Sequence, residues 1–566
     1  MKPDDPNWHS LIEAPRVVED DAEIDWDSDT DLVVVGWGAA GAATALEARE
    51  KGLQVIALDR AEGGGATAMS GGVIYAGGGT STQHEVGEED TPQAMFDYLK
   101  LETQGVVSDA TLMKFCEDGP ETIDWLKGHG VRFSGPVWKK KTSYPNVKYF
   151  LYHSDNSLLP KYKAVAKPAA RGHRGVIRKG RSAVNLGVSI IGPMTRSALA
   201  RGVQLHKKTE VRQLITNKDG RVIGVKALQI VSDSDEYRRH GKYLRRAELI
   251  GKIYPFFLPG GGLARKLAIR YSAKAAAIEA DERHVRYYKA RRGVVLSAGG
   301  FIFNRDMVEH HCKKFRPGMP LGTPADDGGG IRLGESVGGA TDRMDHGTAW
   351  RFINPPLAWS QGIMVNAKGE RFVNESCYGA TVGDAMVKDN DGKGWLILDD
   401  KLVKQAWRQS MPGKVLPFQW QLAALNMLFG KKKFDNSDEL SGKLGLDKDT
   451  LRSTIEEYNR IADGELEDPF GKAPGDVPGL EAPFHVIDVS LGAKLLPCTV
   501  LTMGGLVLNE ETGQVRREDG KEIEGLYAAG RTAVGIPSNL YMSGLSIADC
   551  VFSGRRAGRH ASTAGQ

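Results

Sequence analysis

The stretch DLVVVGWGAAGAATALEAREKGLQVIALD, residues 31–59, decides the fold of this chain. Its first apolar run ends in glycine and predicts a buried parallel strand. The segment after the glycines predicts a helix that stops at Gly52, and a second apolar run predicts a second strand. A strand, a glycine turn, a helix and a strand in this order are typical of the βαβ unit that binds a dinucleotide.

Gly36, Gly38 and Gly41 give this stretch the spacing GxGxxG. Such glycines permit a tight turn and let the backbone approach a pyrophosphate, which lies at the positive end of the helix. Asp59 follows Gly41 by 18 residues, where an acid can bind a ribose hydroxyl. We therefore predict a dinucleotide site, formed by Gly36, Gly38, Ala39, Ala40, Gly41, Asp59 and Arg60.

Three later segments favour FAD over a nicotinamide dinucleotide. ATAMSGGVIYAGGGT, residues 66–80, is a glycine-dense loop in which backbone can approach an isoalloxazine ring. GVVLSAGGF (293–301) and GLYAAGRT (525–532) each predict a strand that ends in glycine, so the nucleotide fold is completed near the C-terminus. The further FAD-binding residues that we expect are Ala68, Ser70, Gly71, Gly72, Val211, Ala298, Gly299, Gly530, Leu545 and Ser546.

Length and composition indicate a globular protein of two or more domains. A chain of 566 residues is too long for one ordinary core, and 41% hydrophobic with 26% charged residues is typical of globular proteins. The five cysteines form no CxxC pair, which argues against a disulfide framework or a metal site. We find no signal peptide and no apolar run of the roughly 18 residues that span a bilayer. We expect a cytoplasmic protein without a metal.

Six motifs together resemble the fumarate reductase/succinate dehydrogenase flavoprotein superfamily. They are GxGxxG at Gly36, MSGG at 69–72, SAGGF at 297–301, GERFVNE at 369–375, TMGGL at 502–506 and GLYAAG at 525–530. The resemblance implies an α/β fold, with a discontinuous Rossmann-like FAD-binding domain and an inserted α+β substrate domain. We expect an N-terminal arm at 1–29, the FAD-binding domain at 30–303 and 487–566, and the substrate domain at 304–486.

Some marks of that superfamily are missing from this chain. Members with covalently bound flavin carry a histidine at a position that aligns with Gly65, so the resemblance implies non-covalent FAD. Dicarboxylate reductases carry an arginine soon after RFVNE and a histidine just before TMGG. Here SCYGATVG follows RFVNE, and Leu501 precedes TMGG. Because a dianionic substrate would lack cationic partners, we expect neither fumarate nor succinate as substrate.

Uncharged hydroxyl groups stand at these places instead. Tyr378 follows NESC, and Tyr541 and Ser543 lie in SNLYMSGLSIADCVFSGRRAG, residues 538–558. If LYMS is extended, Tyr541 and Ser543 share a face. Hydroxyls suit a neutral ketone, since they can polarise a carbonyl or relay a proton. Each of these three residues also has a simpler interpretation. The two tyrosines could be packing residues, and Ser543 could be the N-cap of the last helix.

With these residues the chain resembles flavin-dependent 3-ketosteroid dehydrogenases, and among them the Δ4-(5α) branch. The Tyr-x-Ser pair favours this branch, because the Δ1 branch has a glycine where this chain has Leu545. The resemblance implies a steroid substrate, hydride transfer from C5 to flavin N5, and loss of a proton from C4. Tyr541 would polarise the C3 carbonyl, and Ser543, assisted by Tyr378, would take the proton.

Several alternatives stay open at this point. The chain could be a Δ1-dehydrogenase, a fumarate-reductase-like reductase of another alkene, or a flavin subunit that only transfers electrons. An external acceptor, quinone-like or of another kind, would reoxidise the flavin.

A basic and aromatic insert, residues 236–292, separates two predicted strands that the superfamily joins by a short connection. It holds 15 Lys or Arg and five Asp or Glu, an excess of ten in a chain of net charge +4. Its aromatic and apolar centre is Tyr254, Phe256, Phe257 and Leu258. This pattern on a short helix favours a peripheral contact of residues 236–288 with the inner face of the cell membrane. A solvated arm and an oligomer contact are alternatives, and we expect no nucleic-acid partner.

Overall fold

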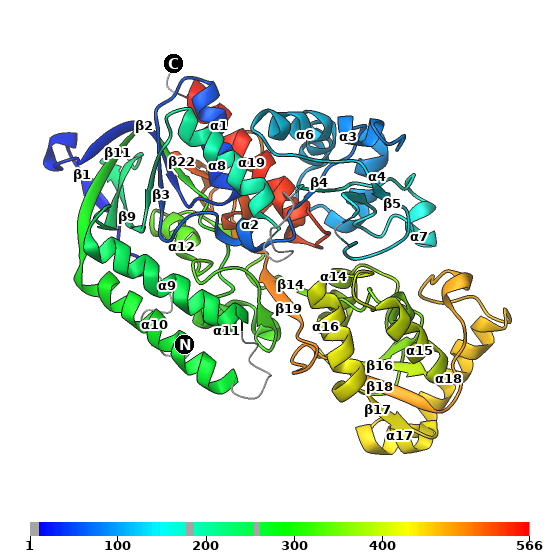
Figure 1. Ribbon diagram of the computed structural model, residues 1–566. Helices are drawn as coiled ribbons and strands as arrows, with labels where there is room; N and C mark the ends of the chain where they lie inside the picture. The colour runs from blue at the N-terminus through cyan, green and yellow to red at the C-terminus, as the bar shows by residue number, and fades with distance from the viewer. Residues whose placement is uncertain (1–10, 147, 177–185, 254–260, 565–566) are drawn as a thin grey trace.

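A computed structural model describes residues 11–146, 148–176, 186–253 and 261–564 (Figure 1). Within these residues the largest sheet has nine strands, in the order β1-β9-β10-β11-β2-β3-β8, with β22 beside β11 and β21 beside β22. Its strands are β1 (Arg16–Val18), β2 (Ser28–Val35), β3 (Val55–Asp59), β8 (Gln204–Lys207), β9 (Thr209–Asn217), β10 (Val222–Ile230), β11 (Arg283–Leu296), β21 (Gln514–Arg516) and β22 (Glu522–Ala528). Segments from both halves of the chain therefore share one sheet.

The predicted strand–helix–strand unit is confirmed. β2 pairs in parallel with β3 and with β11, and helix α1 (Ala39–Glu50) connects β2 to β3. The C-terminal helix α19 (Leu545–Thr563) packs along α1. A Cβ added at Gly554 would lie 2.4 Å from the carbonyl oxygen of Ala40, so glycine allows the two helices their close approach. The end of the chain thereby completes the nucleotide-binding fold, as expected.

A smaller antiparallel sheet lies apart from the large one, with its own apolar core (Figure 1). Its order is β15 (Ile363–Val365), β16 (Trp395–Asp399), β18 (Phe484–Asp488) and β17 (Lys432–Phe434). Nearby helices are α14 (Gly379–Asp389), α15 (Asp400–Gln409), α16 (Pro417–Leu425), α17 (Ser437–Leu444) and α18 (Lys448–Ala462). The fold class is therefore the predicted one. The division into domains stays a prediction: its boundary at 486/487 falls inside β18, and β1 of the predicted arm pairs with β9.

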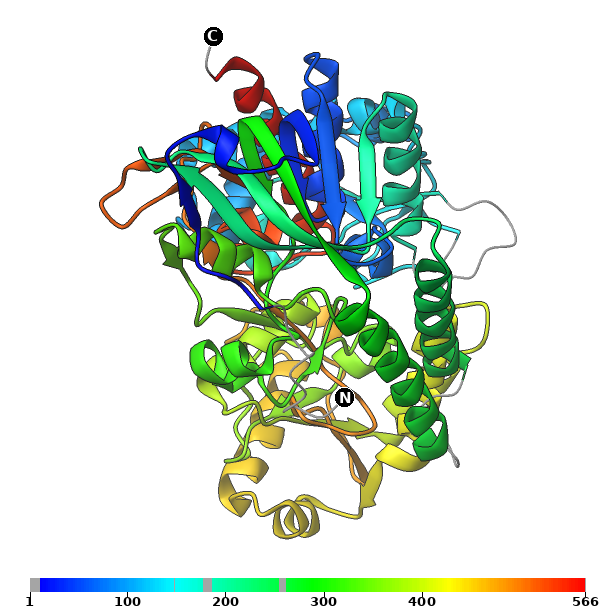
Figure 2. The same cartoon turned by 90° about the vertical axis from the view of Figure 1, so that its left-hand side faces the viewer.

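The basic insert differs from its prediction in shape. Helices α9 (Asp235–Ile253) and α10 (Gly261–Asp281) form a hairpin beside the sheet, in place of the predicted short helix (Figures 1 and 2). β11 starts at Arg283 and pairs with β10 from Ile230↔Arg283 to Gly224↔Lys289, so residues 283–292 belong to the sheet. The strand starts before its predicted first residue because residues 224–230 of β10 pair with residues 283–289. The predicted aromatic centre, 254–258, lies outside the described residues.

Acidic residues of the N-terminal segment neutralise part of the insert's charge. Arg286 pairs with Asp27 at 2.5 Å, and Lys289 pairs with Asp21 at 2.5 Å. Arg291 lies 2.9 Å from an acid on β2. The basic excess that is available to a partner is therefore concentrated on the hairpin. In the described part of the chain, no helix combines the length and apolarity needed to cross a bilayer.

The RFVNE motif forms a buried ion-pair cluster in the smaller part of the fold. Arg371 lies 2.8 Å from Glu375 and 2.5 Å from Asp468, and the ammonium of Lys472 lies 3.1 Å from Glu375. Glu375 is fully buried and also accepts a hydrogen bond from the backbone of Met364. Burial alone would raise the pKa of Glu375, but Arg371 and Lys472 lower it to about 2. The motif thus stabilises the fold.

We expect Glu375→Gln to lower the free energy of unfolding by about 3–5 kcal/mol, because it leaves buried cations without their partner. The folded pKa lies below the usual value of 4.5, so the carboxylate's contribution is present above that pH and is lost as pH falls towards 2. Urea unfolding at neutral and at acidic pH should show that the free energy of unfolding falls more with acidification in the wild type than in the variant. Glu481→Gln, in an exposed pair with Lys401, is the control and should change little. Equal stability of Glu375→Gln and wild type at neutral pH would contradict this.

Candidate active site

A cavity of about 690 Å³ opens at the carboxyl ends of the parallel strands, where ligands bind in open α/β sheets. One wall comes from the turn after β2, the end of β3, helix α2 (Gly65–Met69) and the loop after β11. The opposite wall comes from Trp350, Phe352, Tyr378 and helix α16. The cavity therefore lies between the large sheet and the smaller part of the fold.

The three glycines of GxGxxG have two different roles. A Cβ at Gly36, where φ is +100°, would lie 2.6 Å from the carbonyl oxygen of Ser297, and one at Gly41 would lie 2.1 Å from that of Gly36. These two glycines allow close backbone packing. A Cβ at Gly38 would meet no described protein atom closer than the hydroxyl of Thr67 at 3.5 Å. Gly38 lines the cavity at the N-terminus of α1, so its missing side chain leaves room for a ligand.

Arg531 supplies a second sign of an absent ligand. One end of its guanidinium donates to Asp326 at 2.6 Å, whereas Nη1 is buried without a hydrogen-bond partner in the described structure. A buried N–H that is left without a partner costs free energy, and the phosphate or carbonyl oxygens of a bound dinucleotide would satisfy it. Arg531 lines the cavity, so the residues present fit FAD. We did not predict this residue, although it directly follows Gly530 in the GLYAAGRT motif.

Most of the predicted FAD-binding residues line the cavity. These are Gly36, Gly38, Ala39, Ala40, Asp59, Arg60, Ser70, Gly71, Val211, Ala298, Gly299 and Ser546. The carboxylate of Asp59 also accepts backbone hydrogen bonds from Trp37 at 2.8 Å and from Ala61 at 2.8 Å. Asp59 therefore shapes the turn around the site as well as lining it.

Five predicted FAD-binding residues are not among those that line the cavity, and their role in binding FAD stays a prediction. They are Gly41, Ala68, Gly72, Gly530 and Leu545. A Cβ at Gly72 would lie 2.6 Å from the carbonyl oxygen of Leu186, and one at Gly530 would lie 2.9 Å from the sulfur of Cys550. Leu545 is fully buried in the core. A glycine in a motif does not by itself show which side of the backbone meets the ligand.

The three predicted catalytic residues line the same cavity, although they come from distant parts of the chain. Tyr541 packs against Trp350, with ring centroids 4.5 Å apart, and Tyr378 packs edge-on against Phe352 at 5.6 Å. Ser543 is not the N-cap of α19: that position is Gly544, and no side chain caps the helix there. The simpler interpretation of the serine is therefore wrong.

Tyr152, which does not itself line the cavity, adds a buried hydroxyl beside Ser543 that we did not predict. Its oxygen lies 2.9 Å from the hydroxyl oxygen of Ser543. Burial raises the pKa of Tyr152, of Tyr378 and of Tyr541 above the ordinary value of 10. The three tyrosines thus stay protonated at neutral pH, where they can donate hydrogen bonds and pass protons along a chain of hydroxyls.

One buried segment, YHSDNS (152–157), is hydrogen-bonded to the backbone of two of the predicted catalytic residues. The hydroxyl of Ser154 donates to the carbonyl of Ser543 at 3.1 Å. The side-chain oxygen of Asn156 accepts from the backbone N–H of Tyr378 at 2.6 Å. The segment therefore fixes both catalytic stretches relative to each other.

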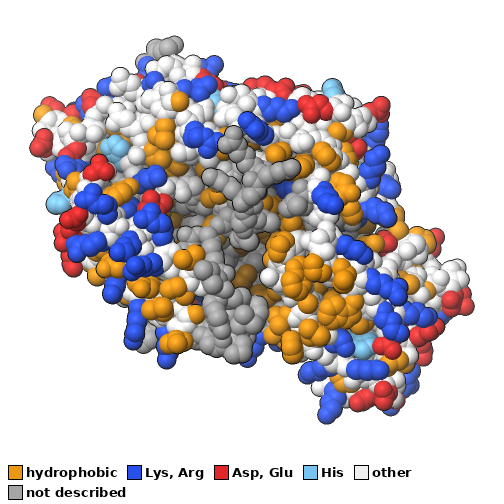
Figure 3. Space-filling model, viewed as in Figure 1, with side chains coloured by type: hydrophobic (Ala, Val, Ile, Leu, Met, Phe, Trp, Pro, Cys, Tyr) orange, Lys and Arg blue, Asp and Glu red, His pale blue; other side chains and the backbone are white. Residues whose placement is uncertain are grey.

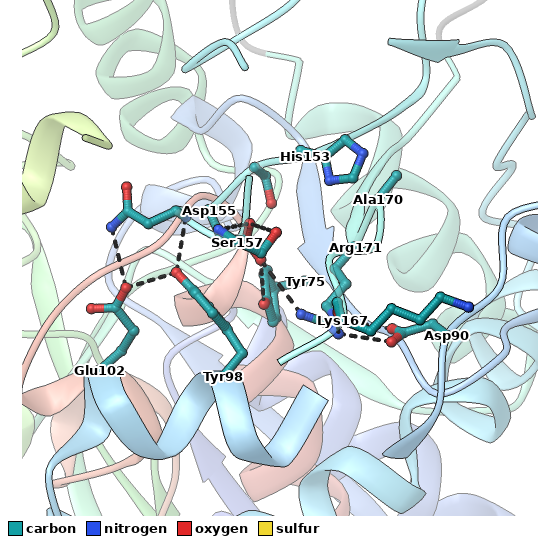
Figure 4. Close-up of polar contacts among 12 residues, drawn as sticks. Tyr75, Asp90, Tyr98, Glu102, His153, Asp155, Ser157, Lys167, Ala170 and Arg171 are labelled. Atoms are coloured by element: carbon teal, nitrogen blue, oxygen red, sulfur yellow. Dashed lines mark hydrogen bonds and ion pairs between the residues drawn. The ribbon is translucent and has the colours of Figure 1, made fainter. Parts of the chain in front are cut away.

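A network of buried polar side chains surrounds Asp155 of this segment (Figure 4). Asp155 accepts hydrogen bonds from Tyr75 at 2.7 Å and from Ser157 at 2.6 Å. Arg171, which is fully buried, pairs with Asp90 through two N–H groups at 2.7 and 2.8 Å. Because each of these groups would be costly to bury alone, the network has few alternative arrangements.

Residues 31–544 match a family described as FAD binding domain. This chain belongs to that family. The cofactor of this FAD-binding protein is therefore FAD. In the described part of the chain, no group of three or more His, Cys, Asp or Glu residues is placed to hold a metal ion.

Two relatives of this FAD-binding protein are named as steroid dehydrogenases. The chain is 36% identical to 3-oxo-5-alpha-steroid 4-dehydrogenase of Comamonas testosteroni, over 90% of this chain and 93% of that one. It is 25% identical to 3-oxosteroid 1-dehydrogenase of Mycobacterium tuberculosis, over 90% and 94% of the two chains.

The fold is also that of a solved structure, 3-ketosteroid-delta4-(5alpha)-dehydrogenase from Rhodococcus jostii RHA1 in complex with 4-androstene-3,17-dione. The TM-score is 0.79 at 26% identity, over 97% of this chain and 100% of that one. The predicted resemblance to the Δ4-(5α) branch is confirmed.

We expect the FAD to be bound without a covalent link, because residue 65 is a glycine and offers no nucleophile to the flavin. Acid precipitation of the purified holoprotein should leave a yellow supernatant and a colourless pellet. A covalent flavoprotein treated in the same way is the control. Yellow colour that stays in the pellet would contradict this expectation.

We expect Tyr152→Phe to slow steroid-dependent flavin reduction by about tenfold or more, because Ser543 loses its hydroxyl partner. FAD content should stay at the wild-type level. Tyr527→Phe is the matched control, because Tyr527 is buried, its hydroxyl lies 3.1 Å from Nδ1 of His560, and it does not line the cavity. Stopped-flow reduction without oxygen measures both variants. If the two variants reduce equally fast, Tyr152 has no part in proton transfer.

Proposed function

We propose that this protein is an FAD-dependent 3-ketosteroid dehydrogenase that introduces the Δ4 double bond. The observation that carries the proposal is the 36% identity, over 90% of the chain, to a 3-oxo-5-alpha-steroid 4-dehydrogenase. The hydroxyl-bearing residues Tyr541, Ser543 and Tyr378, all of which line the cavity, support it. A subunit that only transfers electrons would have no use for such a pocket.

The cavity wall suits a fused-ring ketone. Apolar side chains dominate it around the three hydroxyls: Met319, Leu321, Trp350, Phe352, Phe418, Leu422 and Leu501. The nearby cation Arg351 is not available to a substrate carboxylate, because its guanidinium donates to the carbonyls of Leu496 and Ser490 at 2.8 and 3.0 Å. A neutral, largely apolar substrate with one carbonyl is therefore favoured over a dicarboxylate.

Each hydroxyl has a role in the reaction. FAD, when bound, accepts the hydride that leaves C5 of the steroid. Tyr541, kept protonated by burial, donates a hydrogen bond to the C3 carbonyl and so makes the C4 hydrogen more acidic. The oxygen of Ser543, assisted by Tyr378, takes the C4 proton as its own proton passes to the hydroxyl of Tyr152, 2.9 Å away. Tyr152 in turn gives up its proton, and the relay ends with release of one proton to water. The electrons of the C4–H bond then form the C4=C5 double bond.

A direct experiment tests this function. Anaerobic mixing with a saturated 5α-3-ketosteroid should bleach the flavin, and NMR of the product should show a vinylic hydrogen at C4. A double bond at C1 would favour the Δ1 alternative, and an unbleached flavin would reject the steroid assignment.

We also propose that the hairpin α9–α10 contacts the inner face of the cell membrane, and that an external, quinone-like acceptor reoxidises the flavin. The basic excess of the insert supports the contact. Exposed apolar side chains on the hairpin support it too, Leu263 (75% exposed) and Leu249 (56%) among them. An apolar substrate and an apolar acceptor would both be concentrated in the bilayer.

We expect Tyr541→Phe to lower the rate of steroid-dependent flavin reduction by at least about tenfold, with FAD still bound, because the C3 carbonyl loses its hydrogen-bond donor. Tyr271→Phe is the control, because its ring stacks on Tyr243 in the hairpin. Stopped-flow reduction by saturating steroid measures both. A wild-type rate for Tyr541→Phe would leave Tyr541 with a packing role only.

We expect replacement of residues 236–281 by a short Gly/Ser linker to weaken binding to anionic vesicles, most strongly at low salt, because the basic helices are removed. FAD should stay bound, since Ile230 and Arg283 are already paired neighbours. The deletion must end before β11, and not at residue 288 as the sequence alone suggests. Co-sedimentation with vesicles measures the effect, and unchanged binding would assign the hairpin another role.

A further inference from the structure

We propose that helix α16 and the turn after it form a second membrane-docking face, which brings the mouth of the active-site cavity to an anionic lipid surface. This docking face comprises residues 411–433. It is separate from the helical hairpin. The steroid's route through this face rests on the proposed function, whereas binding of the face to lipid does not.

The segment that contains the docking face has basic residues but no acidic ones. Residues 401–434 contain seven Lys or Arg and no Asp or Glu. Three of the lysines, Lys431, Lys432 and Lys433, are consecutive, and the latter two are exposed. Strand β17 holds Lys432 and Lys433 against β18. A surface segment of one charge that is fixed in this way attracts anionic lipid headgroups.

Apolar side chains are exposed directly beside these lysines. Phe429 is 73% exposed and Leu428 is 62% exposed, in the turn Asn426–Gly430 that ends two residues before β17. Met411, at the other end of the docking face, is 54% exposed. Figure 3 shows hydrophobic side chains gathered over α16. Exposed aromatic and aliphatic side chains next to lysines are typical of proteins that lie on a membrane.

The same helix forms part of the cavity. Phe418, Leu422 and Leu425 of α16 line it. Phe418 is 46% exposed, and two other lining residues, Met319 and Met69, are 42% and 39% exposed. The mouth of the cavity is therefore apolar and continuous with the docking face, so that an apolar substrate could pass from a bilayer into the site without crossing water.

Charge decides between a membrane and a second copy of the chain. A symmetric dimer would bring each docking face against its own copy. The basic residues would then face other basic residues, and the segment has no acid to pair with them. An anionic bilayer has the opposite charge. The hairpin α9–α10 and α16 both lie in the lower half of the molecule in Figure 1, the hairpin at the left and α16 right of centre.

The experiment measures vesicle binding of the holoenzyme and two double variants. Vesicles contain phosphatidylcholine alone, or phosphatidylcholine and phosphatidylglycerol in equal parts. Leu428→Ser/Phe429→Ser removes the apolar contact, and Lys432→Glu/Lys433→Glu reverses the charge. The matched controls are Leu199→Ser/Val165→Ser and Lys51→Glu/Lys218→Glu, at other exposed positions. Flavin reduction by a water-soluble steroid and the melting temperature report on the active site and the fold.

We expect both test variants to bind anionic vesicles at least about fivefold more weakly than wild type, with control variants, soluble-steroid reduction and melting temperature unchanged. High salt should reduce wild-type binding. Wild-type binding by both test variants, or no vesicle binding by the wild type, would overturn the proposal. The wild type could instead be a dimer that does not bind vesicles. If Leu428→Ser/Phe429→Ser then converts this dimer to a monomer, the docking face pairs two copies of the chain. If the water-soluble steroid does not reduce the flavin of the wild type, the steroid assignment is rejected, but the result on lipid binding is unaffected.

Discussion

Two hydrogen bonds, from side chains of one buried segment to the backbone of Ser543 and Tyr378, hold the candidate site together. Ser154 binds the carbonyl of Ser543, and Asn156 binds the N–H of Tyr378. The two predicted catalytic residues are 165 positions apart along the chain, 378 to 543, and their hydroxyls could act on one substrate only if this segment keeps its place. Its own position depends on Asp155, Arg171 and Asp90, whose charges are paired and removed from water. Proton transfer over hydroxyls tolerates little displacement, so rigidity here is a condition of the chemistry.

The sequence could predict the parts of the fold that repeat a local pattern. The unit β2–α1–β3 has apolar runs of strand length and glycines at fixed offsets, and Tyr541 and Ser543 stand together in one short motif. Tyr152 and Arg531 were missed because their roles depend on partners far away in the sequence. The length of β11 was also missed: residues 283–292 read as polar, and only their pairing with β10 makes them a strand.

Motif residues can also have a different role from the one that their motif suggests. RFVNE is a mark of the superfamily near its substrate site, yet Arg371 and Glu375 form a buried ion-pair cluster with Asp468 and Lys472. Gly41 and Gly530 likewise permit close packing of the backbone and do not line the cavity. The local sequence shows that such residues are unusual, but burial and partners decide whether they serve binding or stability.

The helical hairpin is inserted where the chain leaves β10 at Ile230 and returns to the sheet at Arg283, its direct pairing partner. The two ends of the insertion are thus held side by side by the sheet itself. The entropy of closing such a loop grows only with the logarithm of its length, so segments of very different size can occupy the position at similar cost. The position of the insertion is thus independent of the cavity wall, so evolution can replace the hairpin by another segment without moving Tyr541, Ser543 or Tyr378.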